Sequence, residues 1–314
     1  MDATTAWEQV RRTGAEWVQD KCPRLSAALA YYTVFALAPL LVIVISVAGA
    51  LWGNGPVRGA VVAQVASLVG PAAAATVNEL LDNAQAHRPA WATAVAVGGF
   101  VVGATGVFGE LQGALNTIWG VDLRKAGWRH VVKTRLLSFS LLLGVGFLLL
   151  VSLVLSAAWH AVASRLDAVL AGGALEALGR VVDVVVSIGL STVLLAAIYK
   201  VLPDAKVAWR DTWVGALATA LLLAVGKLLI GLYVGHSRAT TLFGAAGSLA
   251  AILVWLYYAG LVLFLGAEWT QVHAEMAGRP LVPKAHAYAV QAVQRDEVKP
   301  GKARRGKPRP HAKA

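Results

Sequence analysis

The chain has 314 residues, of which 58% are hydrophobic and only 14% are charged, and its net charge at pH 7 is +11. Its mean hydropathy is +0.64. A water-soluble fold of this length could not bury so much apolar surface, so the composition excludes an ordinary soluble protein. Lipid must form part of the solvent of this chain.

Six apolar stretches are long enough to cross a bilayer, because about 20 mostly apolar residues span a hydrocarbon core of roughly 30 Å. Backbone amides in lipid must form hydrogen bonds within their own segment, and the stretches lack the residue alternation of membrane strands. The sequence therefore predicts an all-α integral membrane protein with six transmembrane helices. They are Leu25–Trp52, Ala90–Trp119, Leu136–Trp159, Val181–Leu202, Trp213–Val234 and Ala245–Trp269.

Lys and Arg are unevenly distributed between the two sides of this arrangement. The N-terminal segment, the second and fourth loops and the C-terminal segment hold 22 of the 28 basic residues, when Lys200 at the end of the fourth span is counted with the fourth loop. The other loops hold five, and Lys227 lies within the fifth span. Short basic segments stay in the cytoplasm. Both termini are therefore expected to be cytoplasmic.

The spans divide the chain into three regions, 1–24, 25–275 and 276–314. In the first region, Thr5 and Glu8 have the spacing of a capping box, which predicts a short helix. This helix is amphipathic, and its apolar face would lie along the cytoplasmic membrane interface. That face contains Trp7, Val10, Trp17 and Val18. The single cysteine, Cys22, can form no internal disulfide and is expected to be free.

The third region is expected to be a basic, disordered cytoplasmic tail. Residues 294–314 contain almost no apolar side chains that could form a core. The basic side chains of this tail can bind anionic lipid headgroups, each contributing on the order of 1 kcal/mol. Nucleic acid is not an expected partner, because no aromatic residue is interleaved there to stack on a base. The basic residues are Lys299, Lys302, Arg304, Arg305, Lys307 and Arg309.

Two of the outer loops are too long to be turns. In Gly53–Pro89, the stretches Val57–Leu68 and Ala75–Ala84 have helical spacing of apolar residues, which predicts two short surface helices. The loop Ala161–Arg180 has similar apolar residues around a Gly pair and predicts a second surface hairpin. Such segments either cap a cavity or shield the bundle. No internal repeat relates the first three spans to the last three, which weighs slightly against an inverted-repeat transporter.

Ionisable residues inside spans are expensive and therefore mark candidate sites. Glu110 lies in the second span, where it either lines a polar cavity together with Asn116 or forms an interhelical hydrogen bond. Lys227 in the fifth span either serves a substrate pathway or snorkels to the outer headgroups. Asp183 is an alternative to Glu110 as its ion-pair partner. Glu268 is expected at the inner end of the sixth span, where headgroups or a basic loop would hold it at little cost.

Glycine and proline shape two of the predicted helices. The second span has two small-xxx-small pairs, Gly99 with Gly103 and Gly109 with Gly113, which permit close helix packing. This pattern indicates the central helix of the bundle, and a homo-oligomer contact is the alternative. Pro39 removes a backbone hydrogen bond and is expected to kink the first span.

A series of short motifs resembles the YihY/BrkB family of bacterial inner-membrane proteins. The series covers about Arg24 to Glu275 in the expected order. Its members are Ala27-Ala28-Leu29-Ala30-Tyr31-Tyr32, Ala38-Pro39-Leu40-Leu41, Ala114-Leu115-Asn116-Thr117-Ile118-Trp119, Lys227 with Tyr233, and Gly266-Ala267-Glu268. The resemblance implies a six-helix bundle in the bacterial cytoplasmic membrane. It also implies a link with virulence or serum resistance, or a role in the export of lipids or small solutes. The family was formerly labelled as a ribonuclease.

The residues do not support enzymatic chemistry. A metal-dependent nuclease needs clustered His and Asp ligands, whereas the seven histidines are dispersed and no two have ligand spacing. No phosphate-binding GxxxxGK[ST], HExxH or GxSxG motif is present either. We therefore expect no enzyme activity, no metal and no cofactor.

Two classes of function remain. A transporter or exporter of a lipid or small anionic solute would place Glu110, Asn116, Lys227 and Asp183 along a polar intramembrane pathway. A membrane scaffold or envelope-integrity factor would need only contact surfaces for protein or lipid, with the same residues packed and mutually bonded. Transport is favoured, because an unpaired intramembrane lysine is costly to retain without a use.

Overall fold

Long helices dominate the part of the chain that the computed structural model describes. This part comprises residues 3–52, 58–59, 62–63, 74, 77–78, 82, 90–123, 140, 144, 174–236, 239–279, 281–284 and 287–289. Its helices are α1 (Ala3–Gln19), α2 (Cys22–Trp52), α5 (Ala90–Ile118), α7 (Ala174–Val201), α8 (Trp209–His236) and α9 (Ala239–Met276). Its strands are β1 (Val121–Leu123), β2 (Ala205–Lys206), β3 (Val282–Pro283) and β4 (Ala287–Ala289).

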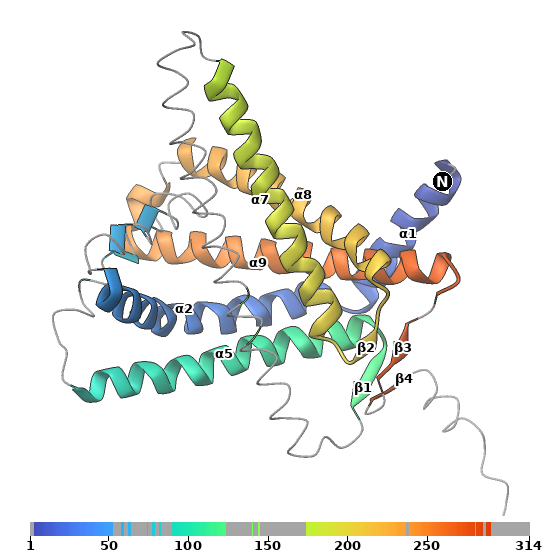
Figure 1. The fold of residues 1–314 in the computed structure, drawn as a ribbon, viewed down its shortest axis with the longest axis horizontal. Helices are drawn as coiled ribbons and strands as arrows, with labels where there is room; N and C mark the ends of the chain where they lie inside the picture. The colour runs from blue at the N-terminus through green and yellow to red at the C-terminus, as the bar shows by residue number, and fades with distance from the viewer. Residues whose placement is uncertain are drawn as a thin grey trace, which may run out of the picture.

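The helices pack in an order that differs from their order in the chain. Helix α2 packs against α5 and α9, and α8 packs against α9 and α7, so neighbours follow the order α5, α2, α9, α8, α7. Helix α1 lies against α9 (Figure 1). Each long helix therefore buries one side against its neighbours and leaves the other side exposed.

All four strands gather at one end of the bundle, which we call the strand end (Figure 1). Strand β1 pairs antiparallel with β4, with Val121 opposite Ala289, and β2 pairs antiparallel with β3, with Ala205 opposite Pro283. The segment that follows α9 thus binds both the loop after α5 and the loop between α7 and α8. The sequence prediction placed this segment in a disordered tail, and residues 281–284 and 287–289 correct it, because backbone pairing orders them.

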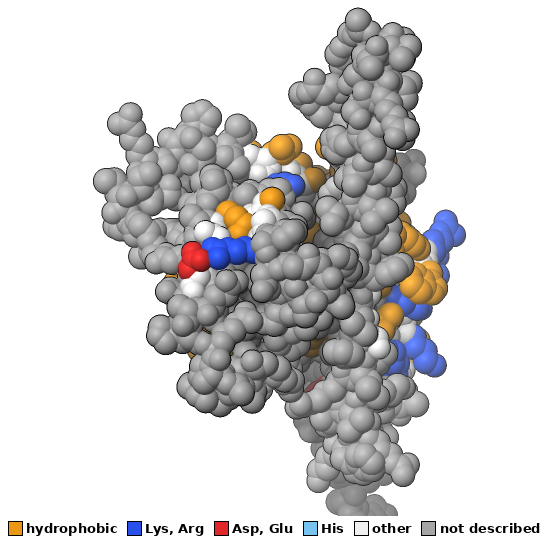
Figure 2. Space-filling view, turned by 60° about the vertical axis from the view of Figure 1, so that its left-hand side comes forward, with side chains coloured by type: hydrophobic (Ala, Val, Ile, Leu, Met, Phe, Trp, Pro, Cys, Tyr) orange, Lys and Arg blue, Asp and Glu red, His pale blue; other side chains and the backbone are white. Residues whose placement is uncertain are grey.

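The hydrophobic core is concentrated at the strand end. Leu115 and Ile118 of α5, Tyr199 of α7 and Phe264 of α9 are almost completely buried there, and the rings of Trp119 and Tyr199 meet edge to face. Several residues of α7 and α8 farther from the strands are exposed, among them Val181, Val184 and Leu228. Figure 2 shows some of the described hydrophobic side chains on the surface beside Lys and Arg side chains. Exposed apolar faces on helices of this length are typical of surfaces that meet lipid.

The structure extends several predicted helices and leaves one untested. In the described residues, three helical segments are long and apolar enough to cross a membrane, Val184–Val201, Trp209–Leu229 and Leu249–Met276. Helix α7 begins at Ala174, so the last part of the predicted hairpin Ala161–Arg180 is instead the first two turns of this helix. The predicted span Leu136–Trp159 lies outside the described residues, apart from positions 140 and 144.

Glycines of α5 create the close contact with α2. A methyl group added at Gly103 would lie 3.0 Å from Ala36, and one at Gly106 would lie 2.7 Å from the Tyr32 ring. At Gly109 and Gly113, an added methyl group would meet nothing within 4 Å. Pro39 lies within the continuous helix α2, but its side chain is outside the described residues.

Two parts of the loop Gly53–Pro89 lie together. Arg58 Nη1 lies 2.6 Å from Asp82 Oδ1, and Arg58 Nε donates a hydrogen bond of 2.8 Å to Asn78 Oδ1. These residues are helical and come from the two stretches predicted as short helices, Val57–Leu68 and Ala75–Ala84. The remaining positions of both stretches lie outside the described residues, except 59, 62–63 and 77.

Candidate functional site

A buried polar cluster around Asp204 joins three parts of the chain at the strand end. Gln112 and Asn116 of α5 each donate a side-chain hydrogen bond of 2.9 Å to Asp204 Oδ2. In return, the Asp204 amide donates to Asn116 Oδ1 at 2.9 Å. Lys284, next to β3, donates from its backbone to the Asp204 carbonyl at 2.8 Å and from Nζ to the Pro203 carbonyl at 2.6 Å.

This cluster decides where Asn116 points. Asn116 and Asp204 are both buried, and the two groups satisfy each other's hydrogen bonds. A fully paired polar group in a core fixes the relative position of the elements that carry it. Asn116 therefore holds α5 against the loop between α7 and α8, which matches the packed arrangement that the sequence allowed as an alternative to a pathway.

Helix α1 turns its polar face toward the protein and its apolar face outward. Gln9 and Thr13 are only 1% and 2% exposed, whereas Trp7 and Val18 are 69% and 66% exposed. Trp17 is partly buried, and its indole donates to the Leu261 carbonyl at 3.4 Å. An outward apolar face with tryptophan at the end of a helical bundle is suited to the lipid interface.

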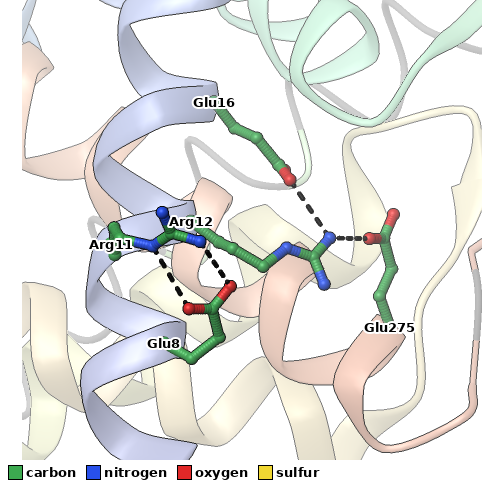
Figure 3. A network of polar contacts seen from close by, with 5 residues as sticks. All are labelled: Glu8, Arg11, Arg12, Glu16 and Glu275. Carbon is green, nitrogen blue, oxygen red and sulfur yellow. Dashed lines mark hydrogen bonds and ion pairs between the residues drawn. The ribbon is translucent and has the colours of Figure 1, made fainter.

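One ion pair on the exposed side of α1 joins it to α9, and two others lie within α1 (Figure 3). Arg12 Nη2 lies 2.8 Å from Glu275 Oε2 and 3.2 Å from Glu16 Oε1. Arg11 pairs with Glu8 on the same helix. Exposed pairs of this kind contribute little to stability because water screens them, so they orient α1 more than they bind it.

The buried end of the α1–α9 contact contains Glu268. Its side chain is fully buried, the Cys22 thiol donates to Oε1 at 3.5 Å, and Oε2 has no hydrogen-bond partner in the described residues. Asp20 and Glu16 are the charged groups that act on it most strongly. The expectation that headgroups or a basic loop would hold Glu268 is therefore wrong, because α1 and the start of α2 cover this carboxyl. Cys22 is free, as predicted.

Burial against this contact raises the pKa of Asp20, which lies in the turn between α1 and α2. A carboxyl with a raised folded-state pKa binds more protons in the folded than in the unfolded protein, so stability falls as pH rises above about 4. We expect Asp20→Asn to make the melting temperature depend less on pH. Melting curves of wild type and Asp20→Asn in one detergent across a pH series will check this. The same dependence of melting temperature on pH in both proteins would contradict this expectation.

Helices α8 and α9 interlock through two glycines and two threonines. The Thr219 hydroxyl of α8 lies against Gly266 of α9, and the Thr270 hydroxyl of α9 lies against Gly215 of α8. Each hydroxyl also donates to a carbonyl one turn earlier in its own helix, at 2.8 Å. The buried Tyr199 hydroxyl donates to the Leu263 carbonyl at 2.6 Å and lies 2.9 Å from Thr219 Oγ1. Gly266 of the family motif is thus a packing residue.

The structure does not bring the remaining pathway candidates together. Lys227 is exposed on α8, and Glu110 is half-buried on α5. Neither forms a hydrogen bond or ion pair with another described residue. Asp183 and Tyr233 lie in α7 and α8, but their side chains are outside the described residues.

The described residues contain no group of three or more His, Cys, Asp or Glu side chains placed to hold a metal ion. Three polar features are the candidate sites in the described residues. They are the Asp204 cluster, the buried Glu268 carboxyl and the exposed Lys227. Together with the long apolar helices, these sites define a multi-pass helical membrane protein.

The comparisons with known proteins place the chain more narrowly. It matches the family described as Virulence factor BrkB over residues 13–289 and belongs to that family, which confirms the resemblance seen in the motifs. No solved structure matches it.

Curated relatives are named only as membrane proteins. A UPF0761 membrane protein of Ralstonia nicotianae is 29% identical over 82% of this chain and 56% of its own length. One of Tolumonas auensis is 35% identical over 51% of each chain, and one of Pseudomonas aeruginosa is 27% identical over 83% of this chain and 61% of its own. The chain thus spans between half and three fifths of the length of these relatives.

Proposed function

We propose that this protein moves a lipid or a small anionic solute across the bacterial cytoplasmic membrane through a pathway that is closed at the strand end. The buried core and the Asp204 cluster support closure there. Figure 1 shows α5 and α7 approaching each other at the strand end and far apart at the other end. Closure on one side of the membrane at a time is what alternating access requires.

Several features support six crossings with both termini in the cytoplasm. The end of α5 lies at the strand end and the start of α7 at the opposite end (Figure 1), so residues 124–173 connect opposite ends of the bundle. An odd number of crossings satisfies that connection, and the sequence offers one span there, Leu136–Trp159. The strand end also holds exposed basic residues of the segments that the charge distribution assigns to the cytoplasm.

The position of Lys227 is the observation that carries the proposal. Ala220 and Ala216 lie seven and eleven residues before Lys227 on the same face of α8, and both are buried. At Lys227 this same face is exposed. Lys227 is thus an exposed cation on the continuation of a face of α8 that is buried nearer the strand end. An anionic headgroup or solute is the ligand that such a lysine would attract.

A lipid-transfer assay tests this role. Purified protein in liposomes that contain a fluorescent phosphatidylglycerol should speed the exchange of this lipid between leaflets, measured by quenching of the outer leaflet. We expect Lys227→Ala to slow exchange by about tenfold, which corresponds to roughly 1.4 kcal/mol of lost transition-state stabilisation. Lys227→Arg keeps the charge and should retain most of the rate.

The matched control is Lys206→Ala, which removes an exposed lysine from β2 at the strand end. It should leave lipid exchange unchanged. If wild-type protein exchanges the lipid no faster than empty liposomes, the same liposomes loaded with small organic anions test the solute version. Failure of both would favour the membrane scaffold or envelope-integrity role, to which the outward apolar face of α1 is also suited.

A further inference from the structure

The contact between α1, α2 and α9 is a polar seam that the proposed pathway does not use. Gln9, Thr13, Glu16 and Asp20 recur at spacings of four, three and four residues, which place them on one face of α1. That face packs against α9. Gln9 and Thr13 are buried, and neither side chain has a hydrogen-bond partner among the described residues. The seam thus buries polar groups that its own residues leave unsatisfied.

The charges of this seam do not balance. Glu16 and Asp20 lie on the face of α1 that packs against α9, and the Cys22 thiol, two residues after Asp20, donates to Glu268 Oε1 at 3.5 Å. These three groups and Glu268 are the titratable groups of the seam. Arg12 is turned to Glu16 and Glu275 on the outer side of α1 (Figure 3), while Lys21 and Arg24 are exposed. Glu268 therefore forms no ion pair within the described residues. A buried carboxylate without a cation is unfavourable by several kcal/mol.

We propose that Asp20 and Glu268 share one proton, so that the seam is a protonation site between α1 and α9. A protonated carboxyl is a hydrogen-bond donor, which the Asp20–Glu268 pair otherwise lacks. Two close carboxyl groups in a buried place retain one proton because both cannot ionise together. The unpartnered Oε2 atom of Glu268 marks the place where the seam lacks a donor.

Loss of this proton would change how α1 is held. The second negative charge would lie between α1 and α9 without a buried cation, and the repulsion would act directly across their contact. The proton leaves toward the cytoplasmic side, because Asp20 is only partly buried in the turn that joins α1 to α2. The site therefore couples proton binding to the docking of α1, whether or not the protein transports a solute.

Infrared spectroscopy of the complete protein in detergent tests the shared proton. The carbonyl stretch of a protonated carboxylic acid should be present at neutral pH and disappear as the pH is raised. Glu268→Gln should remove this band, and Asp20→Asn should move its disappearance to another pH. Glu8→Gln, which changes an exposed glutamate paired with Arg11 on α1, should leave the band unchanged.

Hydrogen–deuterium exchange provides a second readout that does not depend on the band. Amides of α1 should exchange faster in wild type than in Glu268→Gln at the same alkaline pH, and equally at mildly acidic pH. Wild type without a protonated-carboxyl band at neutral pH, or a band that survives in both Glu268→Gln and Asp20→Asn, would overturn the proposal. Equal exchange of α1 in wild type and Glu268→Gln at alkaline pH would overturn its link to docking. None of these outcomes depends on the lipid-exchange result.

Discussion

Gly266→Ala is expected to lower the melting temperature of the protein sharply, because a methyl group at this position would overlap the Thr219 hydroxyl and lie 2.8 Å from Tyr199 Oη. Both neighbours are fixed by hydrogen bonds, Thr219 to the Gly215 carbonyl and Tyr199 to the Leu263 carbonyl. Neither can move without breaking a buried bond. Overpacking of this kind costs about 1–3 kcal/mol, and the lost hydrogen bonds add to it. Heating in detergent followed by size-exclusion chromatography measures the effect.

The matched control for this substitution is Gly109→Ala. Gly109 also lies within an apolar helix, but an added methyl group there would meet nothing within 4 Å. Alanine favours a helix over glycine by about 1 kcal/mol, so the control should be neutral or slightly stabilising. If both variants melt at the same temperature, the tight packing of α8 against α9 is not what Gly266 provides.

Asp204→Ala is expected to have a comparably large effect through lost hydrogen bonds. The change leaves the side-chain amides of Gln112 and Asn116 buried without an acceptor. Each buried amide left without an acceptor costs about 1–3 kcal/mol, and two amides lose theirs. Loss of folded protein in detergent, or a greatly lowered melting temperature, is the expected result.

A double-mutant cycle separates this cluster from general damage. If Asn116 acts through Asp204, the loss for Asn116→Ala plus Asp204→Ala should be smaller than the sum of the two single losses. Asp122→Ala, which removes an exposed side chain of β1 that accepts a surface hydrogen bond from Tyr288, provides a control and should cost much less. Additive losses for the pair, or equal losses at Asp122 and Asp204, would mean that the cluster does not act as a unit.

The apolar pattern predicted the helices well, because each one must present a long apolar surface and the chain records this residue by residue. Helices α2, α5, α7, α8 and α9 coincide with predicted spans. Their ends were less predictable. Helix α7 starts at Ala174 and β3 and β4 follow α9, because end positions depend on contacts with distant segments and not on local hydrophobicity.

The candidate site was harder to predict than the helices. Hydropathy identified Glu268 and Lys227 as unusual, yet it could not tell which of them would be covered. A carboxyl at a helix end looks accessible in the sequence, and only the docking of α1 buries it. Asp204 gave no sequence signal at all, because a lone aspartate in a loop is ordinary until α5 places two amides beside it.

The sequence by itself determined that this protein lies in a membrane, that its helices are long and apolar, and which family it belongs to, since each follows from residue types along one segment or a series of motifs. Tertiary structure alone decided that α1 turns its polar face inward, that the segment after α9 closes the strand end, and that Glu268 is buried while Lys227 is exposed. These features depend on pairs of residues far apart in the chain, whose proximity is set by packing of whole helices and not by any local pattern.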